Sequence, residues 1–153
     1  VGRGTVEQDD CSLTVRRVPL VGTQQQPIRV VIDPNLSLAG NTKYKIFHDG
    51  LATIVYHGLD KEEAKVKSLE ANTSVVCISL PAKEHDSRFQ TTLDVADVLR
   101  DLQQNRGCKH VMIEGGPATA KAFLEAGLID RAVLIRAPLR FKEPYFGVNL
   151  SPE

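Results

Sequence analysis

Residues 109–128, KHVMIEGGPATAKAFLEAGL, contain the pattern from which we predict the fold. Residues 111–113 are apolar and predict a short strand, with Glu114 at its carboxyl end. Residues 115–117, Gly-Gly-Pro, predict a turn, because glycine widens the range of backbone angles and proline suits the first turn of a helix. Residues 118–126 are rich in alanine and predict a compact helix. Together these segments predict one strand–turn–helix unit of an α/β domain.

A phosphate-bearing cofactor fits this turn. Without Cβ atoms at Gly115 and Gly116, a bulky ligand can approach the backbone closely. The helix that follows offers free N–H groups and the positive end of its dipole, and Thr119 adds a hydroxyl. The alternative is a tight connection whose glycines serve only packing, since the turn is not G-x-G-x-x-G. Glu114 either accepts hydrogen bonds from a ligand or is an ordinary acid at a helix end.

The composition is that of an ordinary globular domain. Of the 153 residues, 42% are hydrophobic and 25% are charged, which predicts one domain. Nineteen basic and nineteen acidic residues cancel, so we expect neither a nucleic-acid partner nor a membrane partner. The three cysteines and four histidines lack C-x-x-C and H-x-x-x-H spacings, so we expect a reducing compartment and no metal site. Because Val1 lies inside an apparent strand–turn unit, we expect a piece of a longer protein.

The rest of the chain alternates between strand and helix patterns. The other predicted strands are residues 13–15, 28–33, 44–47, 52–56, 74–80 and 131–137. The other predicted helices are residues 60–70 and a segment from Thr91 or Thr92 to Gly107, whereas residues 1–12 and 81–90 are predicted loops. This alternation predicts an α/β domain with a largely parallel sheet. Ligands of such sheets bind beyond the carboxyl ends of the strands, where Asp33 and Glu114 fall. Asp33 either faces such a ligand or caps the turn that follows its strand.

Three stretches in order carry a resemblance to a known family. VGRGTVEQDDCSLTVR (1–16), PIRVVID (27–33) and HVMIEGGPATAKAFLEAGLIDRAVL (110–134) resemble the reductase domain of riboflavin biosynthesis, and the likeness covers most of the chain. The resemblance implies a dihydrofolate-reductase-like α/β fold, a mostly parallel twisted sheet flanked by helices, and a homodimer. It also implies NADPH-dependent reduction of a ribosylamino-pyrimidine 5′-phosphate to its ribitylamino form, beside a fused or separate deaminase.

The resemblance also implies roles for particular residues. Leu13 and Arg16 would line the substrate pocket, with Arg16 meeting the ribose 5-phosphate, and Glu114 would bind the polar part of the substrate. No catalytic residue is assigned and no metal is implied. The NADPH site would be formed by Thr5, Asp9, Gly115, Gly116, Pro117, Ala118, Thr119 and Ala120.

Some positions depart from the family pattern. Cys11 stands where the family usually has proline, and Pro34 stands where some members have a hydroxyl near the cofactor. Residues 136–150, RAPLRFKEPYFGVNL, are more like the plant and algal versions, which predicts a cytoplasmic or plastid protein. We expect residues 1–153 to be a single reductase-like domain without the family's N-terminal portion, and therefore to have little reductase activity alone.

Two other functions remain open. The domain could be catalytically degenerate and serve as a structural or dimerising module of a riboflavin deaminase. It could also be another dihydrofolate-reductase-like enzyme that acts on a different pteridine or pyrimidine.

Overall fold

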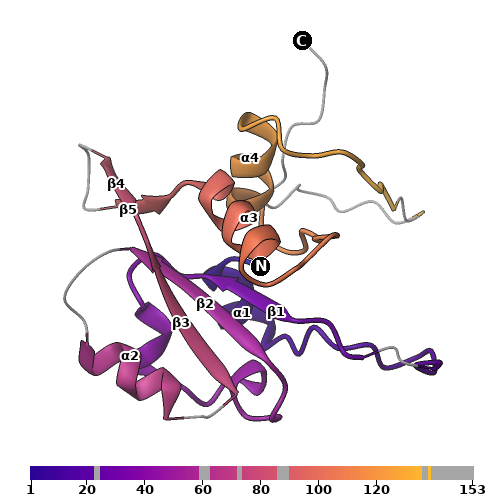
Figure 1. Ribbon diagram of the computed structural model, residues 1–153, viewed down its shortest axis with the longest axis horizontal. Coiled ribbons are helices and arrows are strands. Elements are labelled where there is room, and N and C mark those ends of the chain that lie inside the picture. The colour runs from indigo at the N-terminus through magenta and orange to yellow at the C-terminus, as the bar shows by residue number, and fades with distance from the viewer. Residues whose placement is uncertain (23–24, 59–62, 72–73, 86–89, 136–137, 139–153) are drawn as a thin grey trace.

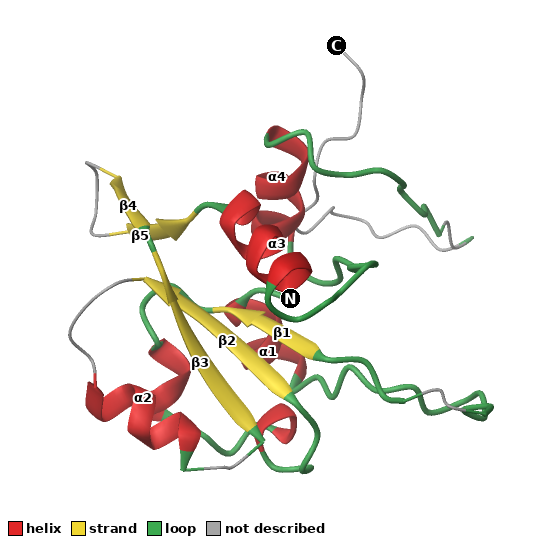
Figure 2. Ribbon diagram, viewed as in Figure 1, coloured by secondary structure: helices red, strands yellow, loops and turns green. Residues whose placement is uncertain are grey.

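The computed structural model describes residues 1–22, 25–58, 63–71, 74–85, 90–135 and 138. Its centre is a parallel sheet in the order β1 (Arg29–Ile32), β2 (Thr53–Gly58) and β3 (Val75–Leu80). These strands are rich in β-branched residues and are covered by helices on both faces, as Figure 2 shows. The predicted α/β class, parallel sheet and strands at residues 28–33, 52–56 and 74–80 are confirmed.

The start of the chain extends this sheet beyond β1. Gly2 forms a parallel bridge with Ile32, and the Ile32 N–H donates to the Val1 carbonyl oxygen at 2.9 Å. Helix α1 (Arg3–Asp9) follows directly, where the sequence predicted a loop, so that prediction is wrong. The helix forms despite Gly4 because Val6 is fully buried against the sheet, and this burial offsets the low helix propensity of glycine.

One face of the sheet packs against α1, α2 (Glu63–Glu70) and the 3-10 turns η1 (Ser37–Gly40) and η2 (Lys45–Phe47). Strand side chains alternate between the two faces, so Val31 and Val55 point into this core. The predicted helix start at Asp60 lies outside the described residues. The buried members of this core are Val6, Val31, Leu36, Leu38, Ile46, Phe47, Val55, Leu69 and Val75.

The other face packs against α3 (Val95–Gln104), which lies across the sheet from α2 in Figure 1. Val98 and Leu102 of this helix contact Ile54 and Tyr56 of β2. The Tyr56 hydroxyl is buried and donates a hydrogen bond to the Asp101 carboxylate at 2.7 Å. This bond joins the central strand to the helix that covers it.

Residues 81–90 are not the predicted loop. They contribute β4 (Ala82–His85) and the start of β5 (Gln90–Leu93), which form an antiparallel hairpin with Ala82 opposite Leu93. The hairpin forms because Leu93 packs into the core beneath α3. Helix α3 accordingly begins at Val95 rather than after Thr91 or Thr92, because the Asp94 side chain accepts a hydrogen bond from the Ala96 N–H at 2.9 Å.

Four further strand predictions are wrong. Residues 13–15 are irregular and residues 44–47 form η2, because side-chain groups rather than a neighbouring strand bind their backbone. Residues 111–113 and 131–135 are also irregular. Their apolar side chains are not packed into a core, since Met112 is 80% exposed and Ile135 is 90% exposed. A strand needs backbone partners, and no neighbouring strand lies beside these segments in the described part of the chain. Residues 136–137 lie outside it.

Helix α4 (Pro117–Glu125) has Gly116 as its N-cap and confirms the helix predicted after the glycine turn. Its Phe123 is buried, whereas the first two residues of the helix are exposed to solvent. No helix within the described ranges combines the length and apolar character needed to cross a membrane.

The Tyr56–Asp101 hydrogen bond makes the stability of the fold depend on pH in the acid range. Burial opposes ionisation of Asp101, but hydrogen bonds from Tyr56 and Asn105 and the charge of Arg106 outweigh it, so the Asp101 pKa falls below 3.8. A lowered folded-state pKa stabilises the fold above the unfolded-state value, and this contribution disappears as the pH falls through the folded-state value.

We predict that Tyr56→Phe lowers the free energy of unfolding by about 1–2 kcal/mol at neutral pH, because it removes a hydrogen bond to a charged group. The loss should shrink as the pH falls through the lowered pKa of Asp101, where the carboxylate of the folded protein becomes protonated. Urea unfolding across this pH range checks it. Tyr44→Phe, at a half-buried tyrosine, is the control and should change little. A loss that is the same at all pH values would contradict the explanation.

Candidate functional site

The N-terminal ends of two helices meet at one place, although they are far apart in the sequence. Thr5 lies in the first turn of α1, and Gly116 is the residue before α4. The Gly116 N–H donates a hydrogen bond to the Thr5 hydroxyl oxygen at 3.0 Å, across 111 positions of sequence. This bond brings together the first and third stretches on which the family resemblance depends.

Missing Cβ atoms permit this approach. Gly115 has φ of 103°, in the region that favours glycine, and a Cβ there would overlap the Thr5 hydroxyl oxygen. A Cβ on Gly2 would likewise overlap the Thr119 hydroxyl oxygen. At Gly116 the nearest atom to a Cβ would be the Thr5 hydroxyl oxygen at 3.6 Å, an ordinary contact. Packing therefore requires glycine at residues 2 and 115, whereas the Cβ position of Gly116 has space.

The first turn of α4 has backbone N–H groups available to an anion. Proline at residue 117 has no N–H, and the Ala120 N–H donates to the Gly116 carbonyl oxygen at 3.3 Å. The N–H groups of Ala118 and Thr119 have no acceptor among the described residues. The Gly116 N–H is donated to the Thr5 hydroxyl oxygen and is therefore not available to an anion. The positive ends of α1 and α4 add together here, which suits a phosphate.

Asp9 and Glu114 lie near Cys11. Burial raises the pKa of the Cys11 thiol, and the negative charges of Asp9 and Glu114 contribute further to the rise. Asp9 is four residues after Thr5 on α1, so the two side chains share a face of the helix. Glu114 is exposed and immediately precedes the glycine turn. Both carboxylates therefore lie close enough to Cys11 to interact with its thiol electrostatically.

The two predicted substrate residues lie further along the chain. Leu13 is half-buried against the core and has φ of 49°, which a leucine rarely adopts. Arg16 is exposed, and no ion pair between it and another described residue is found. Neither residue contacts the Thr5–Gly116 pair directly through a hydrogen bond or ion pair within the described chain.

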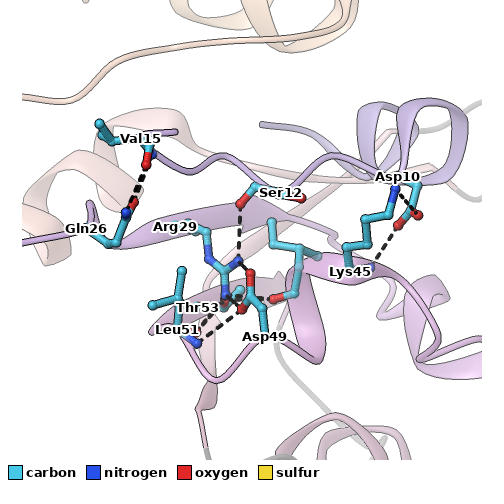
Figure 3. A network of polar contacts seen from close by, with 10 residues as sticks. Asp10, Ser12, Val15, Gln26, Arg29, Lys45, Asp49, Leu51 and Thr53 are labelled. Atoms are coloured by element: carbon cyan, nitrogen blue, oxygen red, sulfur yellow. Dashed lines mark hydrogen bonds and ion pairs between the residues drawn. The ribbon is translucent and has the colours of Figure 1, made fainter. Parts of the chain in front are cut away.

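The sequence analysis did not identify the polar network around Arg29, which holds the segment with Leu13 and Arg16 against the sheet (Figure 3). Arg29 is only 2% exposed, and its guanidinium donates to both carboxylate oxygens of Asp49, at 2.5 and 2.7 Å. It also donates to the Thr53 hydroxyl oxygen at 2.7 Å. Burying a charge is costly unless it is paired and hydrogen-bonded, as here. The available signal was an arginine in an otherwise apolar strand. Its remaining acceptors are the carbonyl oxygens of Ser12, Ile46 and Leu51.

Pairing with Arg29 changes the pKa of the Asp49 carboxylate. Partial burial opposes its ionisation, but hydrogen bonds from Arg29 and the Leu51 N–H, together with the positive charge of Arg29, lower the Asp49 pKa. The ion pair is therefore formed throughout the neutral range and holds β1 to the segment before β2.

The adjacent glycines of the turn give a matched test of its packing. We predict that Gly115→Ala lowers the free energy of unfolding by about 1–3 kcal/mol, because alanine is strained at positive φ and its Cβ overlaps Thr5. Gly116→Ala should change it by less than about 0.5 kcal/mol, because its φ of −55° and open Cβ position accept alanine. Urea unfolding of both variants measures the difference, and equal losses would contradict this packing.

The comparisons with known proteins agree with one another. The family model described as the RibD C-terminal domain matches residues 1–141. Riboflavin biosynthesis protein RibD of Aquifex aeolicus is 33% identical over 138 residues, which cover 90% of this chain and 34% of that protein. The protein of the same name from Mycobacterium tuberculosis (strain H37Rv) is 31% identical over 149 residues, which cover 97% of this chain and 32% of that protein.

A solved structure supports the same fold. The structure titled Acinetobacter baumannii RibD, form 2, aligns with a TM-score of 0.63 at 24% identity, over 94% of this chain and 38% of that one. This chain spans about a third of the length of the curated relatives. By the match of the family model over most of its length, the chain belongs to the RibD C-terminal domain family and has a dihydrofolate-reductase-like α/β fold.

Proposed function

We propose that this chain is an NADPH-dependent reductase domain of riboflavin biosynthesis. In this proposal it reduces the ribosylamino side chain of a pyrimidine 5′-phosphate to the ribitylamino form. The observation that carries the proposal is the meeting of the N-terminal ends of α1 and α4 at the Thr5–Gly116 bond. Membership of the family supports the reaction class, because the named relatives are riboflavin biosynthesis proteins.

The cofactor would lie across this meeting of helices. The free N–H groups of Ala118 and Thr119 are suited to bind a phosphate, and the open Cβ position of Gly116 lets the cofactor approach the backbone. Asp9 shares a helix face with Thr5 and is suited to accept a hydrogen bond from a ribose hydroxyl. NADPH supplies the hydride when it is bound. The chain's own residues bind and orient both partners, and Gly115, Pro117 and Ala120 hold the shape of the turn.

The substrate would lie on the side of residues 13–16. By the family resemblance, Arg16 would bind the ribose 5-phosphate, and a guanidinium can make two parallel hydrogen bonds to a phosphate. Leu13 packs against the core and would form a fixed apolar wall of the pocket. Glu114 is exposed before the glycine turn and would accept hydrogen bonds from the amino and ring N–H groups of the pyrimidine.

The larger assembly is part of the same proposal. The chain covers about a third of each relative, which leaves room for a deaminase fused to it or acting beside it. The homodimer that the family resemblance implies is also part of the proposal. The proposed chemistry requires neither nucleic acid nor a membrane.

The cofactor assignment predicts an effect at Gly116. Gly116→Val should weaken NADPH binding by about tenfold or more, because the side chain fills the open approach to the backbone. Gly40→Val is the control, since its Cβ position in η1 is also open. Titration of cofactor fluorescence measures both affinities, and thermal unfolding checks that each variant is folded. Equal NADPH affinities of the two folded variants would contradict binding of the cofactor at this turn.

The substrate assignment predicts an effect at Arg16. Arg16→Ala should weaken binding of the ribosylamino-pyrimidine 5′-phosphate by about 10- to 100-fold, the loss of charge-assisted hydrogen bonds to a phosphate. Arg17→Ala is the control, because the adjacent arginine is also exposed and carries the same charge. Isothermal titration calorimetry measures both. If the wild-type protein binds neither NADPH nor this substrate, the degenerate structural or dimerising module is the better account.

A further inference from the structure

Residues 10–16 connect the cofactor side of the site to the substrate side. They begin after α1, which carries Thr5 and Asp9, and they end at the exposed Arg16. The segment has no helix or strand, and two of its residues, Asp10 and Leu13, have positive φ values of 44° and 49°. Such conformations cost free energy and persist only where the surroundings hold them. Something other than regular secondary structure therefore fixes this segment.

Three polar contacts hold the segment at its start, middle and end, as Figure 3 shows. At the start, the Asp10 carboxylate accepts one hydrogen bond, from the backbone N–H of Lys45 at 2.8 Å, and forms an ion pair with Lys45 Nζ at 3.1 Å. In the middle, the Ser12 carbonyl oxygen accepts a hydrogen bond from the buried Arg29 guanidinium at 3.2 Å. These two contacts join the segment to η2 and to the interior of the sheet.

The contact at the end belongs to Gln26. The Val15 N–H donates to Gln26 Oε1 at 2.8 Å, and Gln26 Nε2 donates to the Val15 carbonyl oxygen at 3.0 Å. A side-chain amide presents a donor and an acceptor with the chemistry of a peptide group. Gln26 therefore satisfies both backbone groups of Val15 as a neighbouring strand would. The residue so held immediately precedes Arg16.

We propose that Gln26 is a positioning residue for Arg16 and thereby sets the affinity for the sugar phosphate of the substrate. The inference rests on the proposed function, in which Arg16 binds the 5-phosphate. Bidentate binding of a phosphate depends on the orientation of the guanidinium plane. A long exposed side chain also loses less freedom on binding when its backbone is already fixed. Gln26 fixes that backbone at the adjacent residue.

The test compares two neighbouring glutamines. Gln26→Ala removes both bonds to Val15, whereas Gln25→Ala removes an exposed side chain that makes no hydrogen bond to another described residue. Ribose 5-phosphate and NADPH are the two probes, each titrated against the wild-type protein and both variants. Amide hydrogen exchange at Val15 reports directly on the ordering of the segment, and thermal unfolding reports on the fold.

Gln26→Ala should weaken ribose 5-phosphate binding by about five- to tenfold, the loss of an ordered anchor held by two hydrogen bonds. Its NADPH affinity should stay within about twofold of wild type, as should both affinities of Gln25→Ala. Exchange of the Val15 amide should become faster only in Gln26→Ala.

Two results would overturn the positioning role: unchanged ribose 5-phosphate affinity in Gln26→Ala, or equal losses for both probes, which indicate a general structural defect. The proposed function fails separately. A wild-type protein that binds ribose 5-phosphate but not NADPH contradicts the reductase while the comparison of glutamines still decides the role of Gln26. A wild-type protein that does not bind ribose 5-phosphate overturns the positioning role as well.

Discussion

The site depends on the hydrogen bond from the Gly116 N–H to the Thr5 hydroxyl. Taken alone, such a bond contributes only about 1 kcal/mol to stability. Its importance is geometric, because it forms only when a glycine at residue 115 lets Thr5 approach the backbone. The same approach places the positive ends of α1 and α4 together. A contact that the chain needs for packing therefore also creates a place suited to an anion.

A second constraint is the buried guanidinium of Arg29. From its place in β1, Arg29 donates hydrogen bonds to the side chains of Asp49 and Thr53 and to three backbone carbonyl oxygens. One of these carbonyl oxygens belongs to Ser12. The charge is stable there because Asp49 pairs with it and both terminal nitrogens are hydrogen-bonded, although Nε has no partner among the described residues. Through Ser12 the interior of the sheet holds the segment that leads to Arg16. The rigid sheet and the irregular segment are thus parts of one arrangement.

Sequence patterns predicted the parts of the fold that depend on local information. The strand at residues 28–33 is an apolar, β-branched run, and the helix after Gly116 follows a glycine and a proline, so both are readable from neighbouring residues. The patterns failed at residues 13–15, where the Gln26 side chain takes the place of a strand partner. They also failed at α1, because the burial of Val6 stabilises a helix that the local sequence does not predict. The turn was predicted as part of a site, but a partner 111 positions away, Thr5, could not be read from local pattern.

The central claim is that the cofactor binds where α1 and α4 meet. The most direct measurement is the change in the backbone amide resonances of the protein on titration with NADPH, observed by nuclear magnetic resonance. The account predicts that the largest changes, with slower hydrogen exchange, occur at Ala118 and Thr119, whose N–H groups have no acceptor among the described residues. Saturable binding that leaves both amides unchanged and perturbs residues elsewhere would contradict it.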